Sequence, residues 1–240
     1  MSSIRVLAFS SSRVGSSGYL EVASPIIKSF LGDGPLNIAF VPFATADNKY
    51  DEYGEMVRNG LKDLQHSINI VKPGNAKTTV GDSDIIMVGG GNTFKLLHDI
   101  YDLDLYELIK EKVTTGTPYV GWSAGSNITG LTIGTTNDMP IIEPRSFKAF
   151  GFLPFQINPH YINMITEGHN GETRDQRLSE FMKVNPGTKI VGLPEGTALR
   201  LEGEKLTLIG ECAAVLFNEQ ENKEVIKKEI RAGDDISYLL

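Results

Sequence analysis

The stretch YVGWSAGSN, residues 119–127, is the part of the sequence that best defines a fold. It places Ser123 between Gly121 and Gly125 in the pattern G-x-S-x-G. In this pattern the serine occupies a strained turn between a strand and a helix, and a Cβ on either glycine would crowd neighbouring backbone. The residues before Ser123 favour a strand, and those after it can begin a helix. The stretch therefore predicts a strand–turn–helix unit, which carries either a nucleophile on a nucleophile elbow or only a structural turn.

Short apolar runs alternate with longer segments of helical periodicity along the chain up to this unit. We expect strands in residues 4–10, 36–44, 68–72, 84–91 and 118–123, and helices in residues 18–32, 51–64 and 92–116, the last with a break. This alternation is typical of a mostly parallel sheet covered on both faces. After Gly187 the strands are closely spaced, which favours an antiparallel addition to the sheet. The absence of a repeat or linker predicts a single α/β domain over residues 1–240.

The charge and composition of the chain limit the kinds of molecule it can bind. The formal charge is −7, the pI is near 5.2, and the basic residues are scattered, which argues against nucleic acid or an anionic membrane as the main partner. The N-terminal apolar run is too short for a signal peptide, and no segment is long enough to span a bilayer, so a cytoplasmic protein is expected. The single cysteine, Cys212, has apolar neighbours and is predicted to be an inert core thiol.

A serine nucleophile needs a general base, and the chain has four histidines. His66 and His98 occupy ordinary helix or surface positions, whereas His169 lies in a glycine-flanked polar loop better suited to binding or capping. His160 follows a strand-like run and a proline that restricts the backbone, so its side chain can be aimed into a site. We therefore predict His160 as the base.

A base histidine needs an acceptor on its second ring nitrogen. Asp138 lies in a loop before an expected apolar strand, and Glu195 follows a strand between Pro194 and Gly196. Either carboxylate can orient His160, and either can instead be a turn residue bonded to backbone N–H groups. The sequence leaves both possibilities open.

The segment VGGGN, residues 88–92, runs from a strand end through glycines into a helix. Free backbone N–H groups gather at such a helix N-terminus and can hold an anion. The segment lacks the lysine of a P-loop and does not match a dinucleotide fingerprint, so a nucleotide is the weaker interpretation. We expect the N–H groups of Gly91 and Ala124 to bind the oxyanion of a tetrahedral intermediate.

Six motifs together resemble one family. In chain order, GGGNTF, GWSAGSN, TTNDMPI, INPHY, EGHNGETRDQR and GLPEGTAL look like those of the peptidase E family of aspartyl dipeptidases. This resemblance implies the three-layer flavodoxin-like fold of the class I glutamine amidotransferase-like superfamily, and hydrolysis of dipeptides that begin with aspartate. It also implies Ser123 as nucleophile and His160 as base. The carboxylate that orients the base has been assigned in the family at the positions of both Asp138 and Glu195.

An acidic dipeptide substrate needs a cation in the site, because an unpaired buried carboxylate is costly. The resemblance points to Arg174 for this role, and Arg177 is its neighbour in the same motif. Both arginines can also belong to a solvated helix face with nearby carboxylates. Further polar residues that can hold the substrate amine or line the pocket are Asn92, Asn127 and His169. No H-E-x-x-H or C-x-x-C spacing occurs, so neither a metal nor another cofactor is expected.

Three other functions are compatible with the pattern. A cyanophycin-degrading peptidase would also cut at aspartate, but in a branched polymer. An α/β-hydrolase esterase would place its histidine last, and none follows Glu195. A non-catalytic amidotransferase-like binding protein would use the serine turn only structurally. The chain is expected to be a monomer or a homodimer.

Overall fold

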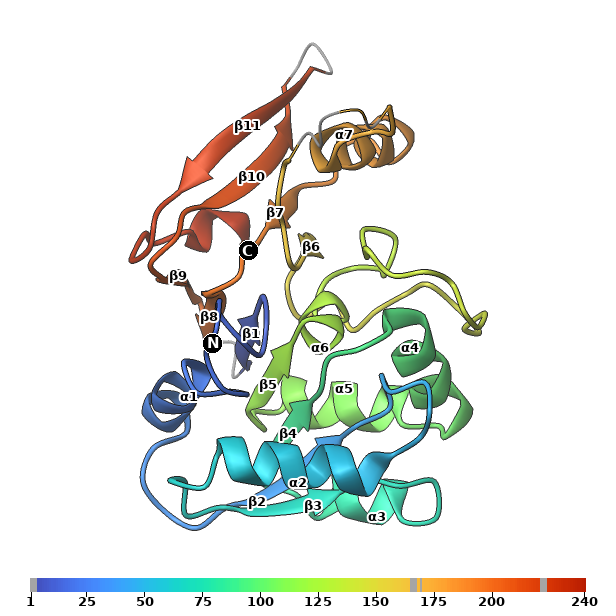
Figure 1. Ribbon diagram of the computed structural model, residues 1–240, viewed down its shortest axis with the longest axis vertical. Helices are drawn as coiled ribbons and strands as arrows, with labels where there is room; N and C mark the ends of the chain where they lie inside the picture. Colours follow the sequence, from blue (N-terminus) through green and yellow to red (C-terminus); the bar gives the residue numbers. More distant parts are fainter. Residues whose placement is uncertain (1–3, 165–167, 169, 221–223) are drawn as a thin grey trace.

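The computed structural model describes residues 4–164, 168, 170–220 and 224–240. Two sheets organise the described part of the chain, and they lie one above the other in Figure 1. The larger has seven strands in the order β3-β2-β4-β5-β1-β8-β9, and the smaller has four in the order β11-β10-β7-β6.

The strands of the larger sheet are β1 (Arg5–Phe9), β2 (Asn37–Val41), β3 (Ser67–Ile70), β4 (Ile85–Val88), β5 (Tyr119–Trp122), β8 (Thr197–Glu202) and β9 (Lys205–Gly210). The first five pair in parallel, β8 runs antiparallel to β1, and β9 runs antiparallel to β8. Every residue of β4 and β5 is buried, as expected of parallel strands covered on both faces. The predicted mostly parallel sheet is confirmed.

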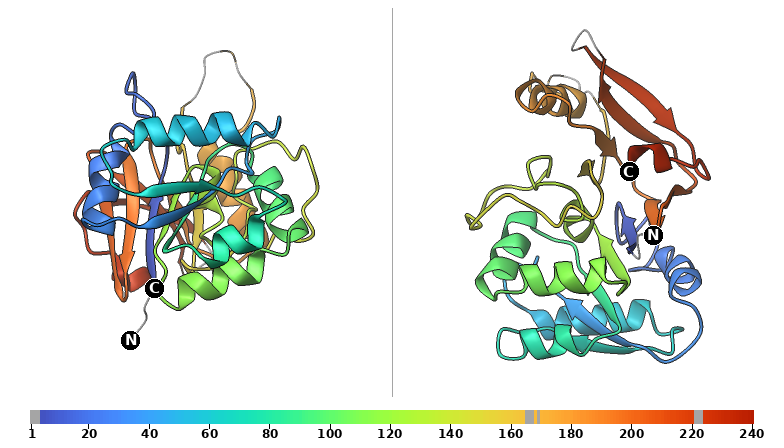
Figure 2. Two further views of the ribbon diagram at one scale, coloured as in Figure 1. Left: turned by 90° about the horizontal axis from the view of Figure 1, so that it is seen from below. Right: turned by 180° about the vertical axis from the view of Figure 1, so that it is seen from behind.

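The helices are α1 (Ala23–Leu31), α2 (Tyr50–Gly60), α3 (Ala76–Gly81), α4 (Thr93–Asp102), α5 (Tyr106–Thr114), α6 (Ala124–Asn127) and α7 (Arg174–Val184), with a short 3₁₀ helix η1 (Ser237–Leu239). The residues of β1 alternate between two buried clusters, one shared with α1 and α2 and the other with α3, α4 and α5. Helices therefore cover both faces of the larger sheet, as Figure 2 shows. The break expected in residues 92–116 falls between α4 and α5, whereas α1 begins five residues later than predicted.

The smaller sheet contains β6 (Gln156–Asn158), β7 (Ile190–Gly192), β10 (Ala214–Glu219) and β11 (Val225–Ile230). Strand β6 is parallel to β7, whereas β10 is antiparallel to both β7 and β11. The antiparallel addition predicted after Gly187 is thus right for β8 and β9 only. Strands β7 and β10 belong to a separate sheet, because β7 takes β6 as its partner and the loop 193–196 then redirects the chain to β1.

Two local predictions are wrong. Cys212 is exposed, because it lies in the turn between β9 and β10 rather than inside either strand. The apolar segment 139–142 is not a strand, and Met139 and Ile141 are 75% and 55% exposed. Pro140 within it has no N–H to offer a sheet ladder. Among the helices of the described residues, none combines the length and apolar character needed to cross a membrane.

Candidate active site

Ser123 lies at the sharp turn between β5 and α6, with φ +53° and ψ −114°. Its N–H donates to the carbonyl oxygen of Phe9 at 3.1 Å, which ties the turn to β1. A Cβ at Gly121 would lie 2.6 Å from the carbonyl oxygen of Gly125, and one at Gly125 would overlap the carbonyl oxygen of Val88. The predicted strand–turn–helix unit is confirmed, and both flanking glycines are needed for steric reasons.

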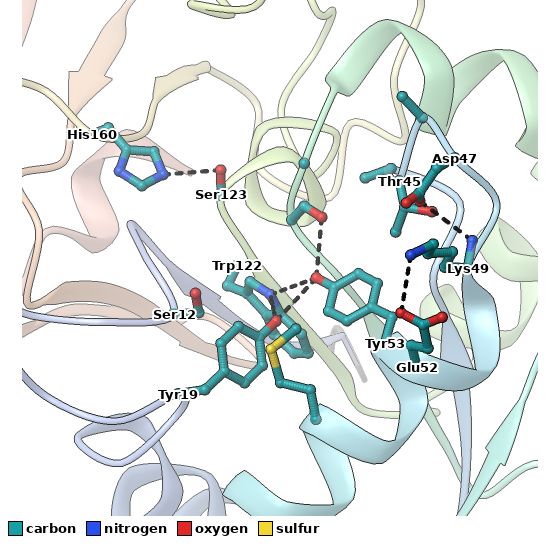
Figure 3. A pocket seen from close by; sticks show the side chains of 15 residues that line it. Ser12, Tyr19, Thr45, Asp47, Lys49, Glu52, Tyr53, Trp122, Ser123 and His160 are labelled. Atoms are coloured by element: carbon teal, nitrogen blue, oxygen red, sulfur yellow. Dashed lines mark hydrogen bonds and ion pairs between the residues drawn. The ribbon is translucent and has the colours of Figure 1, made fainter.

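His160 follows β6 and Pro159, and its backbone also has a positive φ, +51°. Its ring Nε2 lies 3.0 Å from the Oγ of Ser123, and its Nδ1 lies 2.8 Å from Oε1 of Glu195. Figure 3 shows the ring turned toward the serine at the edge of a pocket. Because a carboxylate can only accept, the neutral ring carries its proton on Nδ1 and Nε2 is free to accept from the serine hydroxyl.

The loop that carries His160 is held by a buried serine at the end of β1. The N–H of His160 donates to Ser10 Oγ at 2.9 Å, and that hydroxyl donates to the carbonyl oxygen of Leu193 at 2.7 Å. Leu193 precedes Glu195 by two residues. Ser10 therefore joins the backbone of the histidine loop to that of the Glu195 loop.

Asp138 makes different contacts. Its Oδ2 accepts from the N–H and hydroxyl of Thr93, at 2.7 and 2.6 Å, and from the hydroxyl of Thr136 at 3.1 Å. Thr93 is the first residue of α4, so the carboxylate lies at a helix N-terminus where negative charge is stabilising. Of the two carboxylates left open by the sequence, Glu195 contacts His160, and Asp138 holds the start of α4.

The glycine loop before α4 packs directly against the serine turn. A Cβ at Gly90 would lie 2.9 Å from the Cβ of Ser123, and one at Gly91, with φ +135°, would overlap the carbonyl oxygen of Ala44. Neither the N–H of Gly91 nor that of Ala124 has an acceptor among the described residues. Two unengaged donors thus flank the serine, one on the loop and one at the start of α6.

A cavity of about 700 Å³ opens beside Ser123 and His160. Its other lining residues come from the N-terminal quarter of the chain, from the glycine loop and from the end of β5: Ser12, Tyr19, Ala44, Thr45, Ala46, Asp47, Lys49, Glu52, Tyr53, Met56, Gly90, Gly91 and Trp122. Lys49 is the one lysine or arginine in this described lining, and its Nζ lies 3.3 Å from a carboxylate oxygen of Glu52. Sequence reasoning missed residues 44–49, although they follow the carboxyl end of β2, where open α/β sheets place their ligands.

Arg174 is the first residue of α7 and is half-buried, but it does not line this cavity. Burial, and then the neighbouring charge of Arg177, lower the pKa of Arg174. No carboxylate in the described part of the chain forms an ion pair with it, whereas Arg177 lies 3.9 Å from Glu172.

Asn92 and Asn127, two further polar residues singled out from the sequence, have structural partners. The side chain of Asn92 accepts from the N–H of Lys95 as the cap of α4 and donates to the carbonyl oxygen of Met139. Asn127 is buried and donates to the carbonyl oxygen of Ile157. His169 lies outside the described residues. Within the residues described, no three His, Cys, Asp or Glu side chains gather closely enough to hold a metal ion.

Comparison with known proteins identifies the class. Residues 6–209 match the sequence profile of peptidase family S51, and the chain belongs to this family of serine peptidases.

Relatives of high sequence identity carry a more specific name within this family, peptidase E. The chain is 52% identical over 238 residues to peptidase E of Shewanella amazonensis and 50% identical to peptidase E of Shewanella oneidensis, in both cases covering 99% of each chain. Its fold is similar to that of a peptidase from an acI-B1 Actinobacterium, with a TM-score of 0.68, 16% identity, and coverage of 97% of this chain and 96% of the other.

Proposed function

We propose that the chain is a serine dipeptidase that hydrolyses dipeptides whose first residue is aspartate. The observation that carries this proposal is the alignment of Ser123 Oγ, the His160 ring and the Glu195 carboxylate, at 3.0 and 2.8 Å, beside an open cavity. The peptidase E name of relatives that match almost the entire chain supports a dipeptidase over a general esterase or a binding protein.

The mechanism follows from these positions. His160 takes the proton of Ser123 through Nε2 while Oγ bonds to the scissile carbonyl carbon, and Glu195 stabilises the imidazolium through Nδ1. The N–H groups of Gly91 and Ala124 hold the oxyanion. His160 then gives its proton to the leaving amine, the C–N bond breaks, and an aspartyl ester remains on Ser123. Water, with His160 again as base, hydrolyses that ester.

The turn at Ser123 serves in this scheme as a nucleophile elbow. A non-glycine residue at positive φ stores about 1–3 kcal/mol of strain and persists only where its surroundings impose it. Here the strained turn follows the fully buried strand β5 and places Ser123 beside the cavity, and in this scheme the N–H of Ala124, the first residue of α6, faces the reacting carbonyl. The parallel sheet with helices on both faces and the serine at the end of β5 fit the three-layer flavodoxin-like fold of the class I glutamine amidotransferase-like superfamily.

We assign recognition of the substrate side-chain carboxylate to Arg174. A half-buried guanidinium that lacks a carboxylate partner among the described residues is already partly desolvated, which strengthens its attraction for an incoming anion. Tyr161, the residue that follows His160, lies close enough to Arg174 to influence its pKa, so the arginine lies near the loop that carries the base.

The proposal is tested with dipeptides that carry Asp, Glu, Asn, isoAsp or Ala first, assayed with and without a chelator. We expect Asp-X to be cleaved most efficiently and the chelator to have no effect. Arg174→Ala should lower kcat/KM for Asp-X by on the order of 10²-fold, since a charge-assisted hydrogen-bond pair contributes about 1.5–3 kcal/mol. Arg177→Ala is the matched control, and its kcat/KM should change less than about threefold because its ion pair is exposed. Equal losses on Asp-X and Ala-X would reject the assignment of Arg174.

A further inference from the structure

Three aromatic side chains that line the cavity form a hydrogen-bonded cluster (Figure 3). The hydroxyl of Tyr19 donates to that of Tyr53 at 3.0 Å, and the indole N–H of Trp122 lies 3.0 and 3.1 Å from the same two oxygens. The hydroxyl of Tyr53 donates in turn to the carbonyl oxygen of Gly90 at 3.0 Å. The cluster thus ends on the glycine loop that packs against Ser123.

The direction of these bonds follows from the number of protons available. An indole only donates, and a phenol has one proton to give. Because Tyr53 accepts from both Tyr19 and Trp122, its single proton is directed at the carbonyl of Gly90. Burial raises the pKa of Tyr53, so the phenol keeps that proton at working pH. Tyr53 is only 8% exposed, so water does not compete freely for the bond.

The bond to Gly90 also sets the direction of the next N–H. In a planar trans peptide the C=O of one residue and the N–H of the following residue point in opposite directions. With the carbonyl of Gly90 held toward the aromatic cluster, the N–H of Gly91 points away from it and has no acceptor among the described residues. Three consecutive glycines, 89–91, offer little conformational preference of their own, so an external contact has to hold this peptide.

We propose that Tyr53 is a positioning residue for the reaction. Its hydroxyl fixes the plane of the Gly90–Gly91 peptide and thereby aims the N–H of Gly91 at the oxyanion. This inference rests on the proposed function for the identity of the substrate and for the role of the Gly91 N–H at the oxyanion. It applies to any acyl or phosphonyl transfer to Ser123.

The first test is steady-state hydrolysis of Asp-Leu by Tyr53→Phe, which removes only the hydroxyl. We expect kcat to fall about 10-fold or more with KM within about twofold, since losing an oxyanion donor outright costs about 10²–10³-fold in kcat. In Tyr19→Phe the bond from Tyr53 to Gly90 is retained. The fold-loss in kcat of Tyr19→Phe should therefore be at most about a third of the fold-loss of Tyr53→Phe. Equal loss of kcat in the two tyrosine variants would overturn the proposal.

Tyr106→Phe is the matched control for folding. Its hydroxyl is also buried and also donates to a backbone carbonyl, that of Ala149 at 2.7 Å, on the other face of the larger sheet. We expect Tyr53→Phe and Tyr106→Phe to lose similar amounts of thermal stability, measured by circular dichroism, with only the former losing kcat. A loss of kcat that tracks the melting temperature in both variants would assign Tyr53 a structural role.

A second measurement does not depend on the peptide substrate. In the reaction with a fluorophosphonate, Ser123 Oγ bonds to phosphorus, the P–F bond breaks, fluoride leaves, and His160 takes the proton, while the phosphoryl oxygen occupies the oxyanion position. Intact-mass spectrometry gives the labelling rate, which should also fall about 10-fold in Tyr53→Phe. Wild-type labelling without Asp-Leu cleavage would reject the proposed substrate alone. Labelling of Tyr53→Phe at the wild-type rate would reject the positioning of the Gly91 N–H by Tyr53 and leave the proposed substrate untouched.

Discussion

The two sheets contribute unlike parts of the site. The larger sheet supplies Ser123 from a buried parallel strand, where close packing around two glycines imposes a strained backbone. The smaller sheet supplies His160 and Glu195 from loops after β6 and β7, where their side chains are 41% and 52% exposed. Packing therefore secures the nucleophile, whereas a small number of hydrogen bonds secures the base and its carboxylate partner.

These hydrogen bonds converge on the end of β1. Phe9 accepts from the N–H of Ser123, and the next residue, Ser10, bonds to the loops of His160 and Glu195. The N–H of Ser10 also donates to Thr197 in β8. The last residue of β1 and the residue that follows it thus align the two halves of the site.

The largest effect is expected when either half loses its reacting group. Ser123→Ala and His160→Ala should each lower kcat for Asp-Leu by about 10⁴–10⁶-fold while circular dichroism stays unchanged. Because the two residues act as one unit, the double variant should be no slower than either single variant. Additive losses in the double variant would show that the two sheets contribute independently.

The next largest effect distinguishes the two carboxylates, Glu195 and Asp138. Glu195→Gln removes the charge that stabilises the imidazolium and should lower kcat by about 10²–10⁴-fold. Asp138→Asn weakens only the start of α4, so we expect a loss of about 1 kcal/mol in the free energy of unfolding and at most about a 10-fold loss in kcat. Kinetics paired with urea unfolding measure both quantities. A greater kinetic loss at Asp138 than at Glu195 would reverse the assignment.

A smaller loss of kcat than at Glu195 is expected at Ser10, which joins the loops of His160 and Glu195. Ser10→Ala leaves the N–H of His160 and the carbonyl of Leu193 without their partner, so stability should fall by about 1–3 kcal/mol and kcat by about 10-fold. Ser126→Ala is the control, because its hydroxyl is equally buried and bonds the carbonyl oxygens of Phe9 and Gly121 without contacting the histidine loop. Similar kcat values in the two variants would remove Ser10 from the alignment of the site.

The sequence predicted the parts of the fold that are set by local composition. Apolar runs predicted the strands of the larger sheet, and the glycine spacing predicted the turn at Ser123, because both depend on near neighbours. The separation of β7 from β8 was missed, because β7 takes its partner β6 from over thirty residues away. Cys212 was misplaced because its apolar neighbours belong to β10 while the cysteine lies in the preceding turn.

The sequence also predicted part of the candidate site, namely the residues that stand in local motifs. Ser123 and His160 stand in recognisable motifs, and the structure brings them together. Asp138 and Glu195 could not be separated, because both lie in loops and only the fold shows which one reaches the histidine. Ser10 and Tyr53 had no local signal at all. Each acts through a backbone group far away in the sequence, and such pairings arise only when the chain is folded.

The antiparallel pairing of β1 with β8 has a consequence for synthesis of the chain. Arg5 pairs with Glu202 and Phe9 with Ala198, so one edge of β1 has no partner until almost two hundred further residues have been made. At about 5–20 residues per second, this edge waits roughly 10–40 s. An apolar strand with an open edge is a template for pairing with other chains. A nascent chain stalled before residue 197 should therefore depend on chaperones far more than the finished protein does.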